Sequence, residues 1–483
     1  MSALQKLLIL ILTFDSITNP CSIYFDTLNC DGRKSNVSFS SIFEVVHDRI
    51  EVTTLVIAYT NLSNLQNGNI SLPYFPGLSR LRLYSNGLNV FCKYVISNNT
   101  AIKELSLQNN KLTAVPVTAL EVLANLTYLD LSRNEITVIE RFAFRFSTSL
   151  QYLNVASNRV HIIQRHSLSS LVNLELLSFA NNSIQCRYFF ISEFSSLRNL
   201  KTLNLAHNNI NLTMKANASF SFPAHVLYLS YNALHFLDDF ALNDSTNLRV
   251  LFADNNNISG ISPLLFGKDS INLTTLVLDH NELMTIPVFL IQRLPNLQTL
   301  SLSWNRVTVV PNKAFQQNTH LLSIRLSWNQ IHIVQEMSLQ RLISLKQLDL
   351  RFNNLTSLPP RLFDSVGDFS LLIGGNNFTC DCEIYFLQKW IKKTRFFVDD
   401  IVCLISEFEN FTSLISFEFS DTCPEATSSV TVLTDFPTNV TPSPPTSKVG
   451  FNFLKYWKGV AAVSMFIAVL FSVVALKLIP KRK

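Results

Sequence analysis

LQTLSLSWNRV, residues 297–307, is one copy of an apolar pattern that recurs along most of the 483-residue chain. Each copy fits L-x-x-L-x-L-x-x-N-x-L, and further copies include LTYLDLSRNEI (126–136), LQYLNVASNRV (150–160) and LKQLDLRFNNL (345–355). Self-similarity at a period of about 20 to 50 residues is the signature of a repeat protein. This pattern therefore decides the fold.

The asparagine of the pattern recurs in steps of 24 residues, with excursions of one or two, between residues 50 and 380. Its thirteen positions are Asn86, Asn110, Asn134, Asn158, Asn182, Asn208, Asn232, Asn256, Asn281, Asn305, Asn329, Asn353 and Asn376. Thr60 stands in for it in the first copy. Ten residues after the asparagine, a second apolar column recurs at Leu120, Phe144, Leu168, Leu242, Phe266, Phe315, Leu339 and Phe363.

This spacing predicts an α/β solenoid of about fourteen repeats, residues 50–378, with one curved parallel sheet on its concave face. Alternate side chains of a strand point to opposite faces, so the leucines of x-L-x-L-x face inward. The asparagine amide can satisfy backbone groups that the following turn would leave buried and unpaired. The second apolar column packs the convex side. A single repeat cannot bury its own leucines, so the two ends need caps.

Four of the eight cysteines follow the last repeat, at Cys380, Cys382, Cys403 and Cys423. The segment NNFTCDCEIYFLQKW (376–390) resembles the C-terminal cysteine cap of extracellular leucine-rich repeat proteins. Toll-type receptors, Slit and the variable lymphocyte receptors of jawless fish carry such caps. The resemblance covers about residues 20–424 and implies a leucine-rich repeat solenoid with disulfide caps. It says little about function, which depends on the exposed positions rather than on the repeat.

The resemblance also implies how the cysteines of the C-terminal cap, residues 379–424, are paired. In those families the first cysteine pairs with the third and the second with the fourth, which implies Cys380–Cys403 and Cys382–Cys423. A zinc site is the alternative for a Cys-x-Cys cluster. Spacings of about 20 residues and an oxidising compartment favour disulfides.

The other four cysteines lie closer to the N-terminus. We expect Cys21 and Cys30 to close a short N-terminal cap, residues 19–49, where related proteins often carry four cysteines. Cys92 and Cys186 lie four repeats apart, and because strands stack at about 4.8 Å, roughly 19 Å separate them. A disulfide needs Cα atoms within about 7 Å, so these two should not pair with each other. Buried free thiols and an intermolecular bridge are the alternatives.

Both ends of the chain carry apolar runs. Residues 1–18 have the positive residue, the short apolar run and the small-x-small site of a secretory signal peptide. Residues 459–479 are predicted to be a transmembrane helix, and the basic residues 480–483 a short cytoplasmic tail. A buried core helix and a GPI-anchor signal are the alternatives. Residues 425–458 are rich in Ser, Thr and Pro and predict a stalk, O-glycosylated or simply disordered.

Fifteen N-x-[ST] sequons agree with a secretory route, although any Asn-rich chain produces some by chance. The asparagines are Asn36, Asn61, Asn69, Asn98, Asn125, Asn181, Asn211, Asn217, Asn243, Asn257, Asn272, Asn354, Asn377, Asn410 and Asn439. Together with the signal peptide and the membrane span, they predict a single-pass type I glycoprotein of the plasma membrane with an extracellular ectodomain.

Composition and motifs argue against several function classes. A net charge of +5 with only 15% charged residues does not indicate nucleic-acid binding. His161 and His166 lack the acidic partner of a metalloprotease helix, and the chain has no G-x-S-x-G motif and no Gly-rich phosphate loop. We therefore expect no enzyme activity, no metal site and no cofactor.

The residues just before Thr60 and before each asparagine from Asn86 to Asn353 are expected to be exposed strand positions of the concave face, and the last four of them are His280, Trp304, Trp328 and Phe352. Aromatic and arginine side chains are enriched at binding hot spots, whereas mutual bracing of large side chains is the alternative. No sequon falls between Asn272 and Asn354, the longest such gap in the ectodomain. We hypothesise that a ligand binds here, through Asp279, His280, Trp304, Arg325, Trp328, Arg351 and Phe352.

This layout is typical of a cell-surface receptor or co-receptor that recognises an extracellular ligand, and the resemblance to Toll-type ectodomains favours innate immune recognition. The ligand would be a protein or a microbial glycan or lipid. A cytoplasmic tail of four residues is too short to bind a kinase or adaptor specifically, so a membrane partner would transmit the signal. Cell–cell adhesion is the alternative, and inhibition of a soluble factor is a third class.

Overall fold

A computed structural model describes residues 21–33, 52–62, 71–185, 191–211, 223–237, 242, 245–266, 272–393, 398–399, 401–405, 410–419 and 423. The chain divides into two units, Met1–Ala426 and Thr427–Lys483, and all described residues belong to the first. The predicted signal peptide, stalk, membrane span and tail lie outside the described residues. No helix in the described part is long and apolar enough to cross a bilayer.

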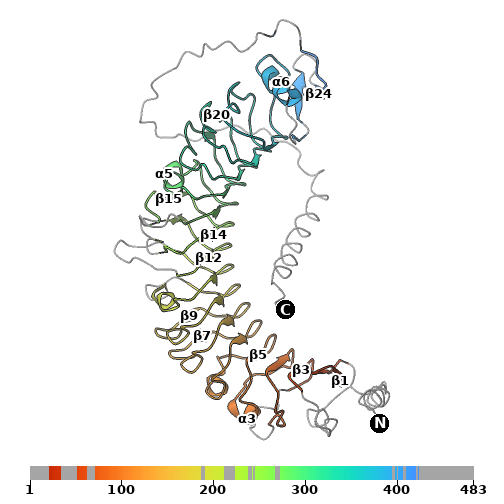
Figure 1. Ribbon diagram of the computed structural model, residues 1–483, viewed down its shortest axis with the longest axis vertical. Coiled ribbons are helices and arrows are strands. Elements are labelled where there is room, and N and C mark those ends of the chain that lie inside the picture. Colours follow the sequence, from red (N-terminus) through yellow and green to blue (C-terminus); the bar gives the residue numbers. More distant parts are fainter. Residues whose placement is uncertain are drawn as a thin grey trace, which may run out of the picture. The chain divides into compact units, whose positions relative to one another are not determined.

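The described residues form a sixteen-stranded sheet that lines the inner side of a curved stack of coils (Figure 1). Within this sheet, β1 and β2 pair antiparallel, and all other neighbouring strands pair parallel. In spatial order the strands are β1 (Cys21–Tyr24), β2 (Thr27–Asp31), β3 (Thr54–Ala58), β4 (Arg80–Tyr84), β5 (Glu104–Ser106), β6 (Tyr128–Asp130), β8 (Tyr152–Asn154), β10 (Leu176–Ser178), β11 (Thr202–Asn204), β12 (Val226–Tyr228), β14 (Val250–Phe252), β16 (Thr275–Val277), β17 (Thr299–Ser301), β19 (Ser323–Arg325), β21 (Gln347–Asp349) and β22 (Ser370–Leu372). The predicted parallel-sheet solenoid is confirmed.

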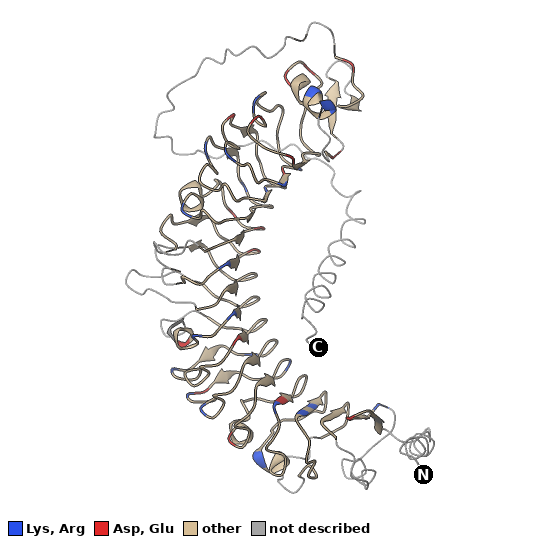
Figure 2. Ribbon diagram, viewed as in Figure 1, with Lys and Arg blue, Asp and Glu red and all other residues tan. Residues whose placement is uncertain are grey.

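The outer side of the stack is built from short elements. Its two-stranded pairs are β7 (Val138–Ile139) with β9 (Ile162–Ile163), β13 (Phe236–Leu237) with β15 (Gly260–Ile261), and β18 (Val309–Val310) with β20 (Ile333–Val334). Its helices are α3 (Lys93–Ile96), α4 (Val117–Leu120), η2 (Ile191–Ser196) and α5 (Val288–Ile291). The second apolar column is buried, as predicted, since all eight of its side chains are at most 5% exposed. Charged residues are spread thinly over the coils (Figure 2).

Each asparagine of the repeat, here called a ladder residue, bonds to the main chain as the sequence predicts. The Nδ2 group of Asn305 donates to the carbonyls of Leu278 at 2.9 Å and Leu302 at 3.1 Å. Its Oδ1 accepts from the N–H of Leu283 at 3.0 Å. Because a buried peptide group without a partner is costly, this one side chain stabilises the turn in which it lies and the coil before it.

Disulfides hold both caps. Cys21–Cys30 joins β1 to β2, which extends the parallel sheet by one strand beyond the first repeat. The C-terminal cap contains α6 (Tyr385–Lys393) and the antiparallel pair β23 (Val402–Ile405) and β24 (Asn410–Ser413). It is crosslinked by Cys380–Cys403 and Cys382–Cys423, the pairs that the resemblance implied.

The two remaining cysteines are separate cases. Cys92 is a free thiol, as one of the two alternatives states, but it is only half-buried rather than fully buried. It directly precedes α3 and packs against the hydrophobic core. Cys186 lies outside the described residues.

Candidate ligand-binding surface

The residue before Thr60 and the residue before each ladder residue from Asn86 to Asn353 do not lie on a strand. All thirteen, here called the turn column, have φ between +52° and +61°. They are Tyr59, Ser85, Asn109, Arg133, Ser157, Asn181, His207, Tyr231, Asn255, His280, Trp304, Trp328 and Phe352. These residues are exposed or half-buried, as predicted, but the prediction that they lie on strands was wrong. Most strands of the repeats are only three residues long, and the chain has entered a left-handed turn when it reaches these residues.

Main-chain hydrogen bonds repeat the same turn in successive coils. The N–H of Trp304 donates to the carbonyl of Ser327 at 2.9 Å, and the N–H of Trp328 donates to that of Arg351 at 2.9 Å. A non-glycine residue in the left-handed region costs about 1–2 kcal/mol, which this bond and the ladder asparagine offset. Because the turn is identical in each coil, neighbouring side chains of the column lie at the spacing of the strands, about 4.8 Å.

At that spacing flat rings stack, and four consecutive rings form what we call the aromatic stack: His280, Trp304, Trp328 and Phe352. The ring centroids of successive members are 5.0, 4.3 and 4.2 Å apart, with interplanar angles of 13°, 8° and 19°. Trp304, Trp328 and Phe352 are nevertheless 45%, 38% and 43% exposed. The rings thus brace one another through their faces, as the alternative interpretation expects, and present their edges to solvent. That a ligand binds these rings stays a prediction.

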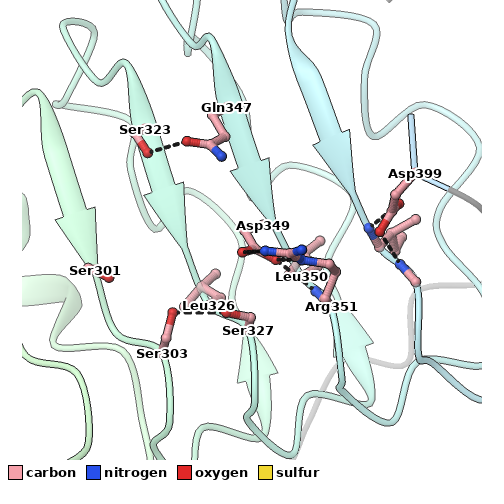
Figure 3. Close-up of polar contacts among 12 residues, drawn as sticks. Ser301, Ser303, Ser323, Leu326, Ser327, Gln347, Asp349, Leu350, Arg351 and Asp399 are labelled. Atoms are coloured by element: carbon pink, nitrogen blue, oxygen red, sulfur yellow. Dashed lines mark hydrogen bonds and ion pairs between the residues drawn. The ribbon is translucent and has the colours of Figure 1, made fainter. Parts of the chain in front are cut away.

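The stack ends where the repeats meet the C-terminal cap. Gly375 takes the equivalent place after Phe352, with φ of +72°. A Cβ atom there would lie 2.5 Å from the Phe352 ring, so the ring packs directly on the glycine backbone. The N–H groups of Ile373 and Gly374 donate to the Asp399 carboxylate at 2.8 and 2.9 Å, which fixes this backbone to the cap (Figure 3).

The two predicted arginines differ in their freedom to bind a ligand. Arg351 follows β21 rather than lying in the sheet, and Asp349 accepts from its Nε at 3.0 Å and its Nη2 at 2.8 Å (Figure 3). This contact raises the pKa of Arg351 and occupies much of its guanidinium. Arg325 is exposed on β19, between Ser301 and Asp349 of the neighbouring strands, and forms no ion pair within the described residues. Arg325 is therefore the cation of this region that is free for a ligand.

Asp279 does not present its carboxylate to a ligand. The side chain is partly buried and accepts hydrogen bonds from the hydroxyl of Ser301 at 2.6 Å and the N–H of Ser303 at 2.7 Å. Burial raises its pKa, an effect that these two bonds oppose. Asp279 thus links neighbouring coils, and its place among the predicted ligand contacts is not supported by its geometry.

Ten of the fifteen sequon asparagines lie in the described part, and all except the half-buried Asn211 are exposed. Asn257 and Asn354 both follow a ladder residue directly, on the flank that carries the turn column. In the three repeats between them, the residue after the ladder residue is not a sequon asparagine. These three repeats hold most of the aromatic stack. Asn181 lies in the turn column, where its Nδ2 donates to Ser157 at 3.2 Å, rather than on the concave strands.

Sequence reasoning missed an apolar strip in the middle of the concave face. Val226, Tyr228, Val250, Phe252 and Val277, from β12, β14 and β16, are all half-buried there. The rings of Tyr228 and Phe252 stack with centroids 4.8 Å apart. The sequence did carry a signal for this strip. In β12 (VLY) and β14 (VLF), the residues on both sides of the central leucine are apolar. Polar residues fill most of these positions in other repeats.

No cluster of three or more metal-ligating side chains occurs within the described residues. The outward-facing chemistry of this part of the chain is a set of rings, hydroxyls, amides and isolated charges. Such a surface suits non-covalent binding of a partner.

Comparison with known proteins identifies the repeat. Family profiles described as leucine-rich repeats match residues 76–136, 124–184, 196–212, 247–268, 271–331 and 344–366. No curated protein matches the sequence.

Solved structures share the fold at low identity. A chain of the octameric complex of latrophilin 3, Unc5D and FLRT2 is 20% identical, with a TM-score of 0.54 over 70% of this chain and 95% of that one. A leucine-rich repeat protein of Leptospira interrogans is 22% identical, with a TM-score of 0.52 over 75% and 98%. A chain of the LRIM1/APL1C complex is 18% identical, with a TM-score of 0.55 over 68% and 64%. The chain thus carries leucine-rich repeats and has the fold of these leucine-rich repeat structures.

Proposed function

We propose that this chain is a single-pass cell-surface receptor or co-receptor that binds an extracellular protein through the aromatic stack, in innate immune recognition. Three disulfides support an oxidising, extracellular location. The apolar runs at residues 1–18 and 459–479 and the fifteen sequons support secretion and membrane anchoring. The leucine-rich repeat fold is a scaffold for interaction rather than for catalysis.

The observation that carries the proposal is the exposure of four stacked rings. A contiguous patch of exposed aromatic side chains often marks a site of protein interaction, and Trp and Arg are enriched at binding hot spots. Because the ring faces are already paired, a partner meets ring edges, which carry the positive end of the ring quadrupole and the indole N–H donors. Carbonyl and carboxylate oxygens of a protein are the matching groups, and Arg325 adds a charged donor beside them.

The test begins with the full-length chain on the surface of cultured cells, where proximity labelling identifies its ligand. The affinity of that ligand is then measured for Trp304→Ala combined with Trp328→Ala. We expect at least about a tenfold loss of affinity, because two adjacent hot-spot rings are removed. Tyr59→Ala with Tyr231→Ala is the matched control, since both tyrosines are exposed rings of the same turn column outside the stack.

The outcomes separate the possibilities. Unchanged affinity in the tryptophan variant at normal surface levels would reject the aromatic stack as the site. An equal loss in both variants would indicate a general effect on the turns. A ligand that is a membrane protein of a neighbouring cell, together with aggregation of mixed cells, would favour adhesion. A soluble protein, glycan or lipid ligand would favour capture by a co-receptor.

A further inference from the structure

A second surface, far from the aromatic stack along the chain, is strongly basic. Residues 133–166 contain five arginines and two histidines but only two acidic residues, Glu135 and Glu140. The chain as a whole carries 39 basic against 34 acidic residues, so the excess at 133–166 is local.

The fold places three of the five arginines of residues 133–166 on the outside of two neighbouring coils. β7 and β9 pair in parallel, with Val138 opposite Ile162 and Ile139 opposite Ile163. Arg141 and Arg165 follow these strands at equivalent positions of the two coils, and Arg145 follows on the loop after Arg141. Figure 2 shows Lys/Arg segments on the outer loops beside this strand pair.

We call Arg141, Arg145 and Arg165 the basic patch. All three are exposed, and none forms an ion pair within the described residues. The guanidinium of Arg141 lies 4.7 Å from the Phe142 ring centroid, and that of Arg145 lies 4.5 Å from the Phe146 ring centroid. Packing on rings holds the two side chains without neutralising them.

Three further basic side chains lie on the same coils. Arg159 and His161 are exposed on the flank of the same coils, and Arg159 alone is neutralised, by Glu135 at 3.1 Å. The His166 ring stacks on Phe142 with centroids 6.1 Å apart. No sequon falls between Asn125 and Asn181, so the sequence directs no N-linked glycan to these coils.

We propose that the basic patch binds a sulfated polysaccharide. The arginine guanidinium pairs bidentately with planar or tetrahedral oxyanions, and a row of such groups matches a polymer with a repeating charge better than a single anion. This inference rests on the extracellular location of the proposed function, which the three disulfides support and where sulfated polysaccharides are the abundant polyanions. Anionic phospholipids face the cytoplasm instead.

The test measures binding of the purified full-length chain to immobilised heparin at physiological salt. We expect binding that weakens as salt is raised, and at least about tenfold weaker binding for Arg141→Ser with Arg145→Ser and Arg165→Ser. The matched control is Arg293→Ser with Arg341→Ser and Arg361→Ser, which removes the same charge from three exposed arginines of other coils. Its affinity should change by less than about twofold.

The proposal is overturned if the chain does not bind heparin at physiological salt, or if the two triple variants lose affinity equally. It is also overturned if desulfated heparin, double-stranded DNA or phosphatidylserine vesicles bind the patch more tightly than heparin does. Thermal unfolding of both variants excludes misfolding. The Trp304→Ala/Trp328→Ala variant should bind heparin normally, so failure of this proposal and failure of the protein-binding proposal are distinguishable.

Discussion

The two halves of the turn column have the same backbone conformation but present different side-chain surfaces. In the C-terminal half, four rings stack face to face. In the N-terminal half, Asn109 donates to Ser85 at 2.8 Å and Asn181 donates to Ser157 at 3.2 Å, so amides and hydroxyls pair across the same gap. Both halves have φ near +55° and the same main-chain bonds. The repeat thus fixes the backbone conformation, and the side chain at one position decides which surface each half of the solenoid presents.

The largest expected effect tests whether the backbone is really the same in both halves. Asn158 and Asn305 are buried ladder residues, one in each half, and each makes two main-chain bonds through Nδ2 at 3.1 Å or less and accepts one through Oδ1. We expect Asn158→Ala and Asn305→Ala each to lower the free energy of unfolding by about 3 kcal/mol, because buried peptide groups lose their partners. Urea-induced unfolding measures both.

Gln330→Ala, at an exposed position after a ladder residue, is the control for replacing a polar side chain and should change stability by less than about 0.5 kcal/mol. If one ladder variant cost several times more than the other, the two halves would differ in their backbones and not only in their surfaces.

Glycine substitutions in the turn column should have a smaller effect on stability. They separate the contribution of the side chain from that of the backbone conformation. Arg133→Gly should change the free energy of unfolding by less than about 1 kcal/mol, since relief of the left-handed strain offsets the entropy of glycine. Trp304→Gly gains the same relief but loses two ring contacts, at 4.3 and 5.0 Å. It should therefore be destabilised by about 2 kcal/mol. Equal effects of the two variants in urea unfolding would mean that the stack contributes no stability.

The sequence predicts the parts of this molecule that depend on periodicity. The strand leucines, the ladder asparagines and the second apolar column recur in each repeat, so their burial follows from spacing alone. The turn column recurs equally regularly, yet its conformation was not predicted. Nothing in the identity of Tyr59, Arg133 or Trp304 marks a left-handed residue, because only glycine and asparagine signal that region.

The contacts of the candidate site were the least predictable. Asp279 and Arg351 both seemed available from their types, but each has a partner supplied by short-range geometry. The hydroxyl of Ser301 comes from the next coil, and the carboxylate of Asp349 comes from two residues away. Such pairings depend on the direction of each side chain, which the period of the repeat does not encode. That Arg325 has no ion-pair partner within the described residues follows only once the partners of its charged neighbours are known.

The smallest expected effect concerns Asp279, a carboxylate held between two coils beside the start of the aromatic stack. Burial raises its folded pKa above the ordinary value of 3.8. Between pH 3.8 and the raised pKa, Asp279 is more often protonated in the folded chain than in the unfolded chain. The free energy of unfolding therefore falls as the pH rises through this range. Asp279→Asn removes the titration while keeping an acceptor for the N–H of Ser303. The thermal stability of the variant, relative to that of the native chain, should rise as the pH is raised from 3.5 to 7. Asp364→Asn, at an exposed position, controls for the loss of one negative charge, and a gain that shrinks with rising pH would contradict the assignment.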